Sequence, residues 1–174
     1  QECGQQAEAG GNNNVAQTLI LLPEIALSVQ WVARFTKRFG FKPAVWHSGL
    51  TAAQRRDTWR DIATGRAPVV VGARSALFLP YANLQLIVVD EEHEPSYKQE
   101  DVPRYHARDV SIERARIAQA PVILGSATPA MESYHQTQDG YRLLQLPERI
   151  EAVPLPEVQI VDMRRELETG RRIR

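Results

Sequence analysis

The stretch Leu84–His93 has the sequence LQLIVVDEEH. Its branched apolar residues follow one another with almost no alternation, which predicts a strand buried on both faces of a parallel sheet. The strand ends abruptly in Asp90, Glu91, Glu92 and His93. Ligands bind at the carboxyl ends of strands in open α/β sheets, so this acidic turn lies where chemistry is expected. A solvated acidic turn without a function is the alternative that this stretch alone leaves open.

A second apolar run, Val122–Leu124, leads into Gly125–Pro129, GSATP. Two strands that end in DEEH and GSAT, in this order, form a more specific pattern than either strand alone. Together with the segments of helical spacing between the apolar runs, they predict an α/β fold with a parallel sheet. Strands are expected at residues 18–22, 43–47, 67–71, 84–89, 121–124, 141–146 and 157–161, and helices at residues 26–39, 51–64, 106–119 and 128–140.

Two of the expected helices begin with capping signals. Thr51 and Gln54 have the spacing of a capping box, in which each side chain binds the other's backbone amide. Thr128 and Pro129 combine an N-cap hydroxyl with proline at the first helical position, and Gly140 is expected to end that helix. These signals predict where both helices start.

The motifs resemble those of the superfamily 2 helicases, and most fully those of the PriA-like replication-restart helicases. The resemblance covers residues 18–163. It implies a three-layer RecA-like domain of the P-loop NTPase type, with a parallel sheet flanked by helices. The segments that carry it are Pro23–Leu27, His47–Leu50, Gly72–Phe78, Asp90–His93, Ser96–Gln99, Arg104–Asp109 and Gly125–Pro129.

The resemblance also implies an enzyme that uses ATP and Mg²⁺. Asp90 can hold Mg²⁺ through water, because this ion keeps several waters and takes few protein carboxylates. Glu91 would position or deprotonate the attacking water. His93, Ser126 and Thr128 would relay the state of the nucleotide toward DNA. In this family a second motor domain supplies arginines to the transition state.

The segment Glu94–Tyr105 lacks a clear period, and loops of this length are uncommon unless they have a function or are disordered. It mixes aromatic rings with cations, as surfaces that bind single-stranded nucleic acid do. The resemblance identifies it with an aromatic-rich loop that couples DNA to the ATP site. The alternative is that the tyrosines pack on the domain and the charges are solvated. The expected DNA-binding residues are Arg74, Ser75, Tyr97, Lys98, Arg104, Tyr105 and Arg108.

The phosphate loop of the family, Gly-x-x-x-x-Gly-Lys-Ser/Thr, is absent, since none of the ten glycines is followed by lysine. Residues 1–17 are rich in Gln, Asn, Gly and Ala and are expected to be disordered or non-native. Residues 18–147 are expected to form the first RecA-like domain. Residues 148–174 would then be a linker and the start of a second motor domain.

Composition narrows the class of partner. The formal net charge is zero, so any nucleic-acid partner must be held by a local patch. Cys3 is the single cysteine, which excludes an internal disulfide and a cysteine-based zinc site. No apolar run approaches the ~18 residues of a membrane span. We expect a cytoplasmic protein whose partners are single-stranded or forked DNA and, by resemblance, primosome and single-strand-binding proteins.

Three functions follow from these features. The first, which the resemblance favours, is a segment of an ATP-dependent 3′-5′ DNA helicase for replication restart. The second is a non-catalytic module that binds single-stranded DNA or a partner. The third is a metal-dependent hydrolase using Asp90, Glu91, His93 and His106, although Tyr97 stands where the second histidine of His-Glu-x-x-His would be.

Overall fold

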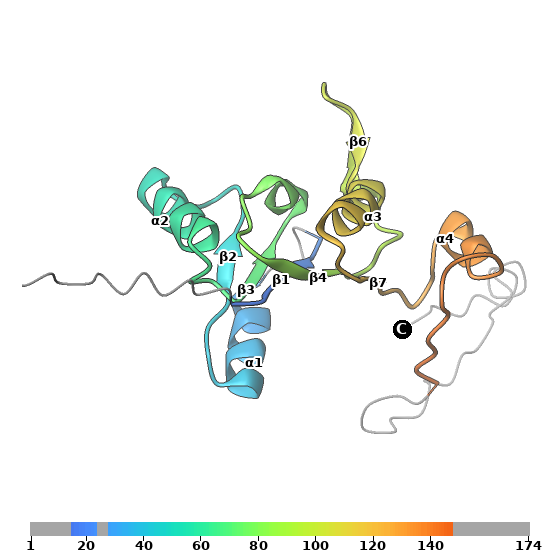
Figure 1. The fold of residues 1–174 in the computed structure, drawn as a ribbon, viewed down its shortest axis with the longest axis horizontal. Helices are drawn as coiled ribbons and strands as arrows, with labels where there is room; N and C mark the ends of the chain where they lie inside the picture. The colour runs from blue at the N-terminus through green and yellow to red at the C-terminus, as the bar shows by residue number, and fades with distance from the viewer. Residues whose placement is uncertain (1–14, 24–27, 148–174) are drawn as a thin grey trace, which may run out of the picture.

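The computed structural model describes residues 15–23 and 28–147, and its centre is a parallel sheet. Five strands lie in the order β2-β3-β1-β4-β7, and each pairs with its neighbours in parallel (Figure 1). The predicted α/β fold is confirmed by this sheet with helices beside it. The strands are β1 (Gln17–Leu21), β2 (Ala44–Trp46), β3 (Val69–Gly72), β4 (Leu84–Val89) and β7 (Val122–Leu124).

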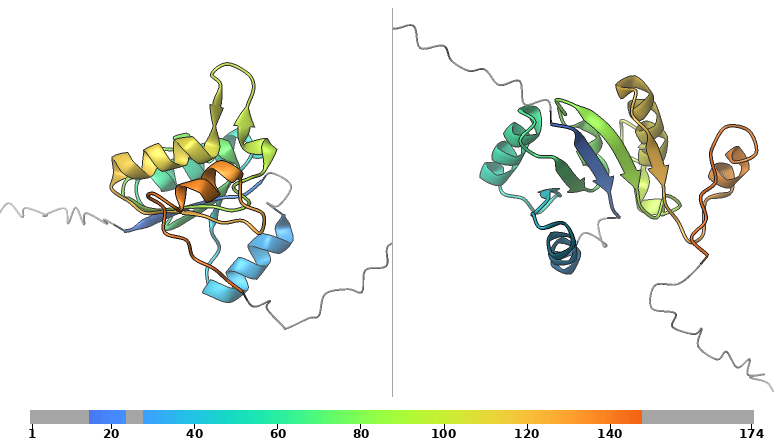
Figure 2. Two further views of the ribbon diagram at one scale, coloured as in Figure 1. Left: turned by 90° about the vertical axis from the view of Figure 1, so that its right-hand side faces the viewer. Right: turned by 60° about the horizontal axis from the view of Figure 1, so that its bottom comes forward.

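The helices are divided between the two faces of the sheet. Figures 1 and 2 show α3 over one face and α1 on the opposite side. One apolar cluster joins the sheet to residues of α2, η1 and α3, so these elements share a face. The helices are α1 (Val29–Phe39), α2 (Ala52–Ala63), the 3₁₀ turn η1 (Arg74–Phe78), α3 (Ala107–Ala118) and α4 (Met131–Gln136).

The two faces of β4 are buried unequally, so the prediction of a strand buried on both faces is wrong. Ile87 and Val89 are fully buried in the main cluster. Val88 points to the other face and is half-buried, and its neighbour Ile123 in β7 is exposed. The physical reason is that, among the described residues, α1 is the one helix on that side.

The boundary expected between residues 17 and 18 is also wrong, because Gln17 belongs to the core. It begins β1 and is fully buried. Its amide nitrogen donates to the carbonyls of Ile62 at 3.1 Å and Ala67 at 3.0 Å, and its oxygen accepts from the Asn83 amide at 3.0 Å. A buried amide that satisfies three backbone groups joins β1 to two loops.

The capping signals in the sequence predicted the start of α2 correctly and the start of α4 incorrectly. The capping box of Thr51 and Gln54 is confirmed, and α2 begins at Ala52. For α4 the prediction is wrong, because Ala130 rather than Thr128 is the N-cap and the helix ends at Gln136. The strand expected at residues 141–146 is also absent from the described part of the chain. The strand expected at 157–161 lies outside the described residues.

The segment between β4 and α3 has more structure than its sequence suggests. It contains a short 3₁₀ turn, η2 (Pro95–Tyr97), followed by β5 (Lys98–Gln99) and β6 (Tyr105–His106). The two strands pair in an antiparallel hairpin that projects from the body of the molecule (Figure 1).

None of the helices in the described residues has the length and apolar composition needed to span a membrane.

Candidate nucleotide and DNA site

The acidic turn lies where three neighbouring strands end. The Asp90 amide donates to the carbonyl of Leu21 at 3.0 Å, which ties the turn to the end of β1. On the other side, the Gly125 amide donates to the Val89 carbonyl at 2.8 Å, and the Glu92 amide donates to the Gly125 carbonyl at 3.0 Å. The DEEH and GSAT motifs are therefore adjacent, as expected for consecutive active-site strands of a parallel sheet.

The three residues expected to relay the state of the nucleotide are brought together. The Nδ1 atom of His93 lies 2.7 Å from the hydroxyl of Ser126, and its Nε2 atom lies 3.3 Å from the hydroxyl of Thr128. A Glu91 oxygen lies 3.6 Å from the same Nδ1 atom. The imidazole thus bridges the acidic turn and the segment after β7, although its assignment to a relay stays a prediction.

Asp90 has a geometry that suits a water-bound magnesium ion. One of its carboxylate oxygens accepts a hydrogen bond from the Glu91 amide at 3.1 Å. Gly125 lies beside this carboxylate, since a Cβ atom placed on it would be 3.7 Å from that oxygen, an ordinary contact distance. Mg²⁺ is commonly bound by one or two carboxylates, with waters and substrate phosphates completing the octahedron. The residues present therefore fit this ion as part of a nucleotide complex.

A fixed backbone conformation presents Glu91. Its φ angle is +48°, in the left-handed region that glutamate rarely adopts. The Glu94 amide donates to the Glu91 carbonyl at 2.8 Å and closes the turn. Strained residues of this kind cluster at functional sites, where the surrounding structure holds them in place. This conformation supports a positioning role for Glu91 beside Asp90.

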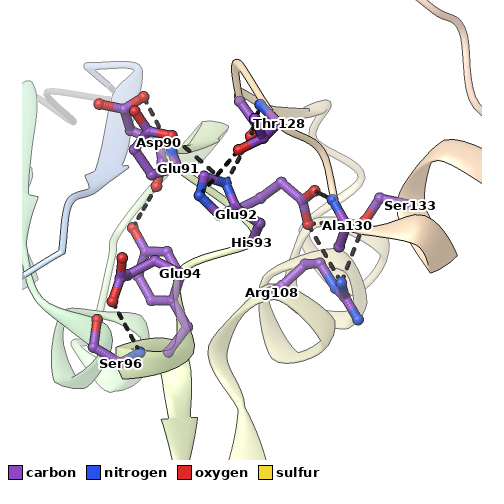
Figure 3. A network of polar contacts seen from close by, with 12 residues as sticks. Asp90, Glu91, Glu92, His93, Glu94, Ser96, Arg108, Thr128, Ala130 and Ser133 are labelled. Atoms are coloured by element: carbon purple, nitrogen blue, oxygen red, sulfur yellow. Dashed lines mark hydrogen bonds and ion pairs between the residues drawn. The ribbon is translucent and has the colours of Figure 1, made fainter. Parts of the chain in front are cut away.

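Glu92 was assigned no role from the sequence, yet it is the most connected acid of the turn (Figure 3). It is fully buried. One carboxylate oxygen accepts from the Ala130 amide at 2.6 Å, and the other accepts from the Ser133 hydroxyl at 2.9 Å and from Arg108 at 3.3 Å. Glu92 therefore joins the turn to α3 and to the start of α4. No local pattern could reveal this, because its partners are 16 to 41 residues away.

Arg108, predicted to bind DNA, is paired within the protein in this arrangement, and its assignment to DNA stays a prediction. Its side chain is 14% exposed and forms ion pairs with Glu92 at 3.3 Å and Asp109 at 3.0 Å. A guanidinium already paired with a buried carboxylate would have to leave that carboxylate uncompensated to reach a phosphate, which is costly. Arg108 is a structural partner of Glu92.

Tyr97 is likewise not a base-stacking residue here, because its ring is only 1% exposed. Its hydroxyl donates to the Asp90 carbonyl at 2.7 Å. Burial and the nearby carboxylates of Asp90, Glu94 and Glu91 raise the pKa of Tyr97 well above its ordinary value. The alternative that this tyrosine packs on the domain is the correct one, and the packing ties η2 to the acidic turn.

Arg74, in η1, holds the start of the hairpin in place. Its Nη1 atom donates to the carbonyls of Ser96 at 2.9 Å and Lys98 at 2.8 Å. Ser75 next to it is exposed. On the hairpin, the side chains of Lys98 and Arg104 are exposed. Their assignment to DNA, like that of Arg74 and Ser75, stays a prediction.

Tyr105 at the base of the hairpin is half-buried and packs edge-to-face against Phe78, with ring centroids 5.2 Å apart. His106, proposed for the hydrolase alternative, caps α3 by accepting from the Arg108 amide at 3.3 Å. Burial, followed by the charge of Arg108, lowers its pKa. Among residues 15–23 and 28–147, no group of three His, Cys, Asp or Glu side chains is placed to hold a metal ion by itself. The hydrolase alternative gains no support from the described residues.

Comparison with known proteins shows the family of the chain. The family model described as DEAD/DEAH box helicase matches residues 5–137. The chain belongs to the DEAD/DEAH box helicases. Within them, the "Replication restart protein PriA" of Bacillus subtilis is 52% identical over 157 residues, which are 90% of this chain and 20% of that protein. The PriA of Synechocystis is 48% identical over 99% of this chain and 21% of its own length.

A third relative, the PriA of Rickettsia conorii, is 48% identical over 86% of this chain and 23% of its own length. The chain is thus PriA-like and spans about a fifth of the length of the curated relatives it matches. The solved C-terminal domain of the DEAD-box protein Dbp5 superposes with a TM-score of 0.43 and 15% identity, covering 72% of this chain and 69% of that domain.

Proposed function

We propose that this chain is part of the first RecA-like motor domain of an ATP-dependent 3′-5′ DNA helicase that acts in replication restart. The observation that carries the proposal is the contact of His93 with Ser126 and Thr128 beside Asp90 and Glu91. Acidic and hydroxyl side chains from two adjacent strand ends are the arrangement that nucleotide-driven motors need. High identity to PriA proteins supports the biological setting.

In the proposed mechanism Asp90 would hold Mg²⁺ through water, and Glu91 would position a water for attack on the terminal phosphate of ATP. The ion, when bound with ATP, neutralises charge on the phosphates. His93 has Glu91 and the Ser126 hydroxyl at Nδ1 and the Thr128 hydroxyl at Nε2, so a change at the acidic turn moves the segment after β7. Glu92 carries the same displacement to α3 and α4.

The proposed route to DNA runs through the hairpin. Tyr97 binds the carbonyl of Asp90, and the next residue, Lys98, is held by Arg74 through its own carbonyl. A movement of the acidic turn therefore reaches Tyr97 through one hydrogen bond and Lys98 as the next residue of the chain. Arg104 lies further along the same hairpin, and both cations are exposed. This short connection is the physical basis for coupling nucleotide state to DNA contact.

Mg²⁺ binding by Asp90 can be measured with Mn²⁺ as a paramagnetic probe in NMR spectra of the 174-residue chain. We expect weak binding that broadens resonances near the acidic turn and disappears in Asp90→Asn. Asp57→Asn is the matched control, because Asp57 is an exposed aspartate paired with Arg56 away from the turn. Equal broadening in wild type and Asp90→Asn would contradict the role of Asp90.

ATP hydrolysis by this chain alone is not expected, because the sequence lacks the lysine and glycines that hold phosphates. Phosphate release with saturating Mg-ATP and single-stranded DNA tests this. Turnover of about 1 to 10³ per second, the ordinary enzyme range, would contradict it.

The second candidate is a non-catalytic module that binds single-stranded DNA or a partner, and the missing phosphate loop favours it. The helicase proposal and the DNA-binding form of the second candidate require DNA binding by the chain, measured as the anisotropy of a labelled oligonucleotide at low salt. Forked DNA, primosome and single-strand-binding proteins, and a cytoplasmic location, belong to the proposal for the whole helicase.

A further inference from the structure

A groove shares Arg74 and Tyr105 with the predicted DNA-binding residues and adds three rings and a cation to which the sequence assigned no role: Trp46, Trp59, Phe78 and Arg55. It has a volume of about 520 Å³, within the range of ligand-sized pockets. Its walls come from the end of β2, from α2, from η1 and from the hairpin. We call it the aromatic groove, and its defining residues are Trp46, Arg55, Trp59, Arg74, Phe78 and Tyr105.

Two of its rings are exposed to a degree unusual for large apolar side chains. Trp59 is 50% exposed and Phe78 is 58% exposed. Phe78 is held by the edge-to-face contact with Tyr105, whose interplanar angle is 86°. Exposed rings that are fixed in place offer faces on which a planar ligand can stack with little loss of conformational entropy.

The cations of the groove are also fixed. The Arg55 guanidinium lies 5.9 Å from the ring centroid of Trp46 and donates to the Ser48 carbonyl at 2.8 Å. Arg74 is held by the hairpin carbonyls. None of the described residues lining the groove is Asp or Glu. The groove therefore attracts an anionic ligand with aromatic groups.

A second groove in the described residues differs from the aromatic groove in its charges. It lies between η1, the start of β4 and α3, and it includes Glu113. Its cation Arg114 is occupied by the carbonyls of Leu77 and Leu79 and lies 5.2 Å from the Tyr81 ring centroid. Phe78 lines both grooves, but of these two the aromatic groove is the one whose described lining residues include a second exposed ring, Trp59, and no acid. It therefore suits a ligand with both bases and phosphates better than the other groove does.

We propose that the aromatic groove binds an unstacked base of single-stranded nucleic acid, with Trp59 and Phe78 as stacking faces and Arg55 facing the adjoining phosphate. Bases inside a duplex are already stacked and cannot enter, so the groove selects single strands. Arg74 lines the groove and also binds the Lys98 carbonyl of the hairpin. A nucleic-acid strand whose base lies in the groove would therefore continue past the exposed side chains of Lys98 and Arg104. The inference rests on the proposed DNA role and adds where a base is held.

The test is the anisotropy of a labelled 20-nucleotide oligo(dT) titrated with the 174-residue chain at low salt. Trp59→Leu and Phe78→Leu keep an apolar side chain and remove the ring, and each is expected to weaken binding about 5- to 150-fold. Tyr134→Leu and Phe39→Leu are matched controls, because these rings are 52% and 59% exposed and lie outside the groove. They are expected to bind as wild type does.

Two further measurements separate stacking from loss of fold. Trp59→Phe retains a ring and is expected to recover most of the affinity lost in Trp59→Leu. An abasic oligonucleotide of the same length carries the phosphates alone; it should bind wild type more weakly and should not discriminate wild type from Trp59→Leu. Circular dichroism establishes that each variant is folded.

DNA binding by the chain and base stacking in the aromatic groove can fail separately. No binding of oligo(dT) by wild type overturns the proposed DNA role, and the groove with it. Binding that both leucine variants retain in full overturns the groove alone and leaves DNA contact to the hairpin. Equal affinity of wild type for the abasic oligonucleotide and oligo(dT) also overturns the groove, because it shows that no base is read.

Discussion

The hydroxyl of Tyr97 donates a 2.7 Å hydrogen bond to the backbone carbonyl of Asp90, seven residues before it. This contact joins the first residue after the buried strand β4 to the 3₁₀ turn that starts the hairpin. It makes the acidic turn and the base of the hairpin one unit. A ring expected to contact DNA directly instead acts on the element that carries the exposed cations.

Replacing Tyr97 by Phe tests this role. The ring stays in the core and only the hydrogen bond is lost, so we expect a loss of about 0.5 to 1.5 kcal/mol in the free energy of unfolding. Affinity for single-stranded DNA should change little, since no base can stack on a buried ring. Urea denaturation and anisotropy give the two values, with Tyr134→Phe as the exposed control. A large drop in affinity without a loss of stability would restore a direct contact for Tyr97.

Alkaline pH should lower the free energy of unfolding through the phenols of Tyr97, which is buried, and Tyr81, which is half-buried. Burial raises the pKa of both Tyr97 and Tyr81 above the ordinary value. Above about pH 10 the unfolded tyrosines lose protons while the folded ones keep them. The unfolded state then binds fewer protons, so the free energy of unfolding falls as pH rises, by up to about 1.4 kcal/mol per pH unit for each tyrosine.

The measurement is urea denaturation at several pH values between about 9 and 11. Lysines titrate in the same window, so the informative quantity is the difference between wild type and Tyr81→Phe/Tyr97→Phe. The double variant should show a shallower decline, and Tyr134→Phe should follow wild type. Identical slopes for wild type and the double variant would mean that neither phenol has a raised pKa.

The Glu92 carboxylate should be important for stability. Glu92→Ala removes the fully buried carboxylate of the Arg108 ion pair and leaves Arg108 with exposed Asp109 as its acidic partner, and breaking a buried pair costs about 3 to 5 kcal/mol. Glu113→Ala is the control, because Glu113 pairs with Arg116 on the surface and exposed pairs contribute about 0 to 1 kcal/mol. Denaturant unfolding compares the two. Equal losses would show that the buried network contributes no more than a surface pair.

The sequence predicted what depends on local pattern and missed what depends on distant partners. The capping box of Thr51 and Gln54 and the strand ending at Asp90 are local, and both were predicted. Gln17 and Glu92 are polar residues in the core whose partners lie 16 to 66 residues away. Their burial is decided by three-dimensional packing, so no period or spacing reveals it.

The start of α4 shows how a tertiary contact overrides a local signal. Thr128 and Pro129 have the residue types of an N-cap and a first helical position. In the structure the Thr128 hydroxyl lies near His93, and Glu92 accepts from the Ala130 amide in place of a local cap. The helix consequently starts at Met131. The residues that move a helix start away from its sequence signal are those of the candidate site, as expected where function competes with local preference.

Close packing at the end of β3 makes Gly72 sensitive to a single methyl group. A Cβ atom there would lie 2.7 Å from the Trp46 carbonyl oxygen and 2.7 Å from the Ala76 Cβ atom. Gly72→Ala is therefore expected to cost about 1 to 3 kcal/mol in the free energy of unfolding. At Gly125 the nearest atoms would lie 3.7 Å away, so Gly125→Ala should stay within about 1 kcal/mol. Thermal denaturation that ranks the two in reverse would contradict this packing.

The last prediction concerns the salt dependence of DNA binding. The chain has no net charge, so a few exposed cations must supply the electrostatic part of the affinity. Each neutralised phosphate of a single strand contributes about 0.7 to the slope of log affinity against log salt concentration. Two to four contacts give a slope of roughly −1.5 to −3 for wild type.

Arg104→Ala should flatten that slope by about 0.7 and weaken binding to all sequences alike, because Arg104 is exposed on the hairpin and would meet a phosphate rather than a base. Arg116→Ala is the matched control, since Arg116 is an exposed arginine on α3 paired with Glu113. Arg74→Ala should also lower stability, because it frees the Ser96 and Lys98 carbonyls. Anisotropy titrations over several salt concentrations give the slopes. If Arg104→Ala and Arg116→Ala flatten the slope equally, binding follows the overall charge of the chain, and the hairpin is not its site.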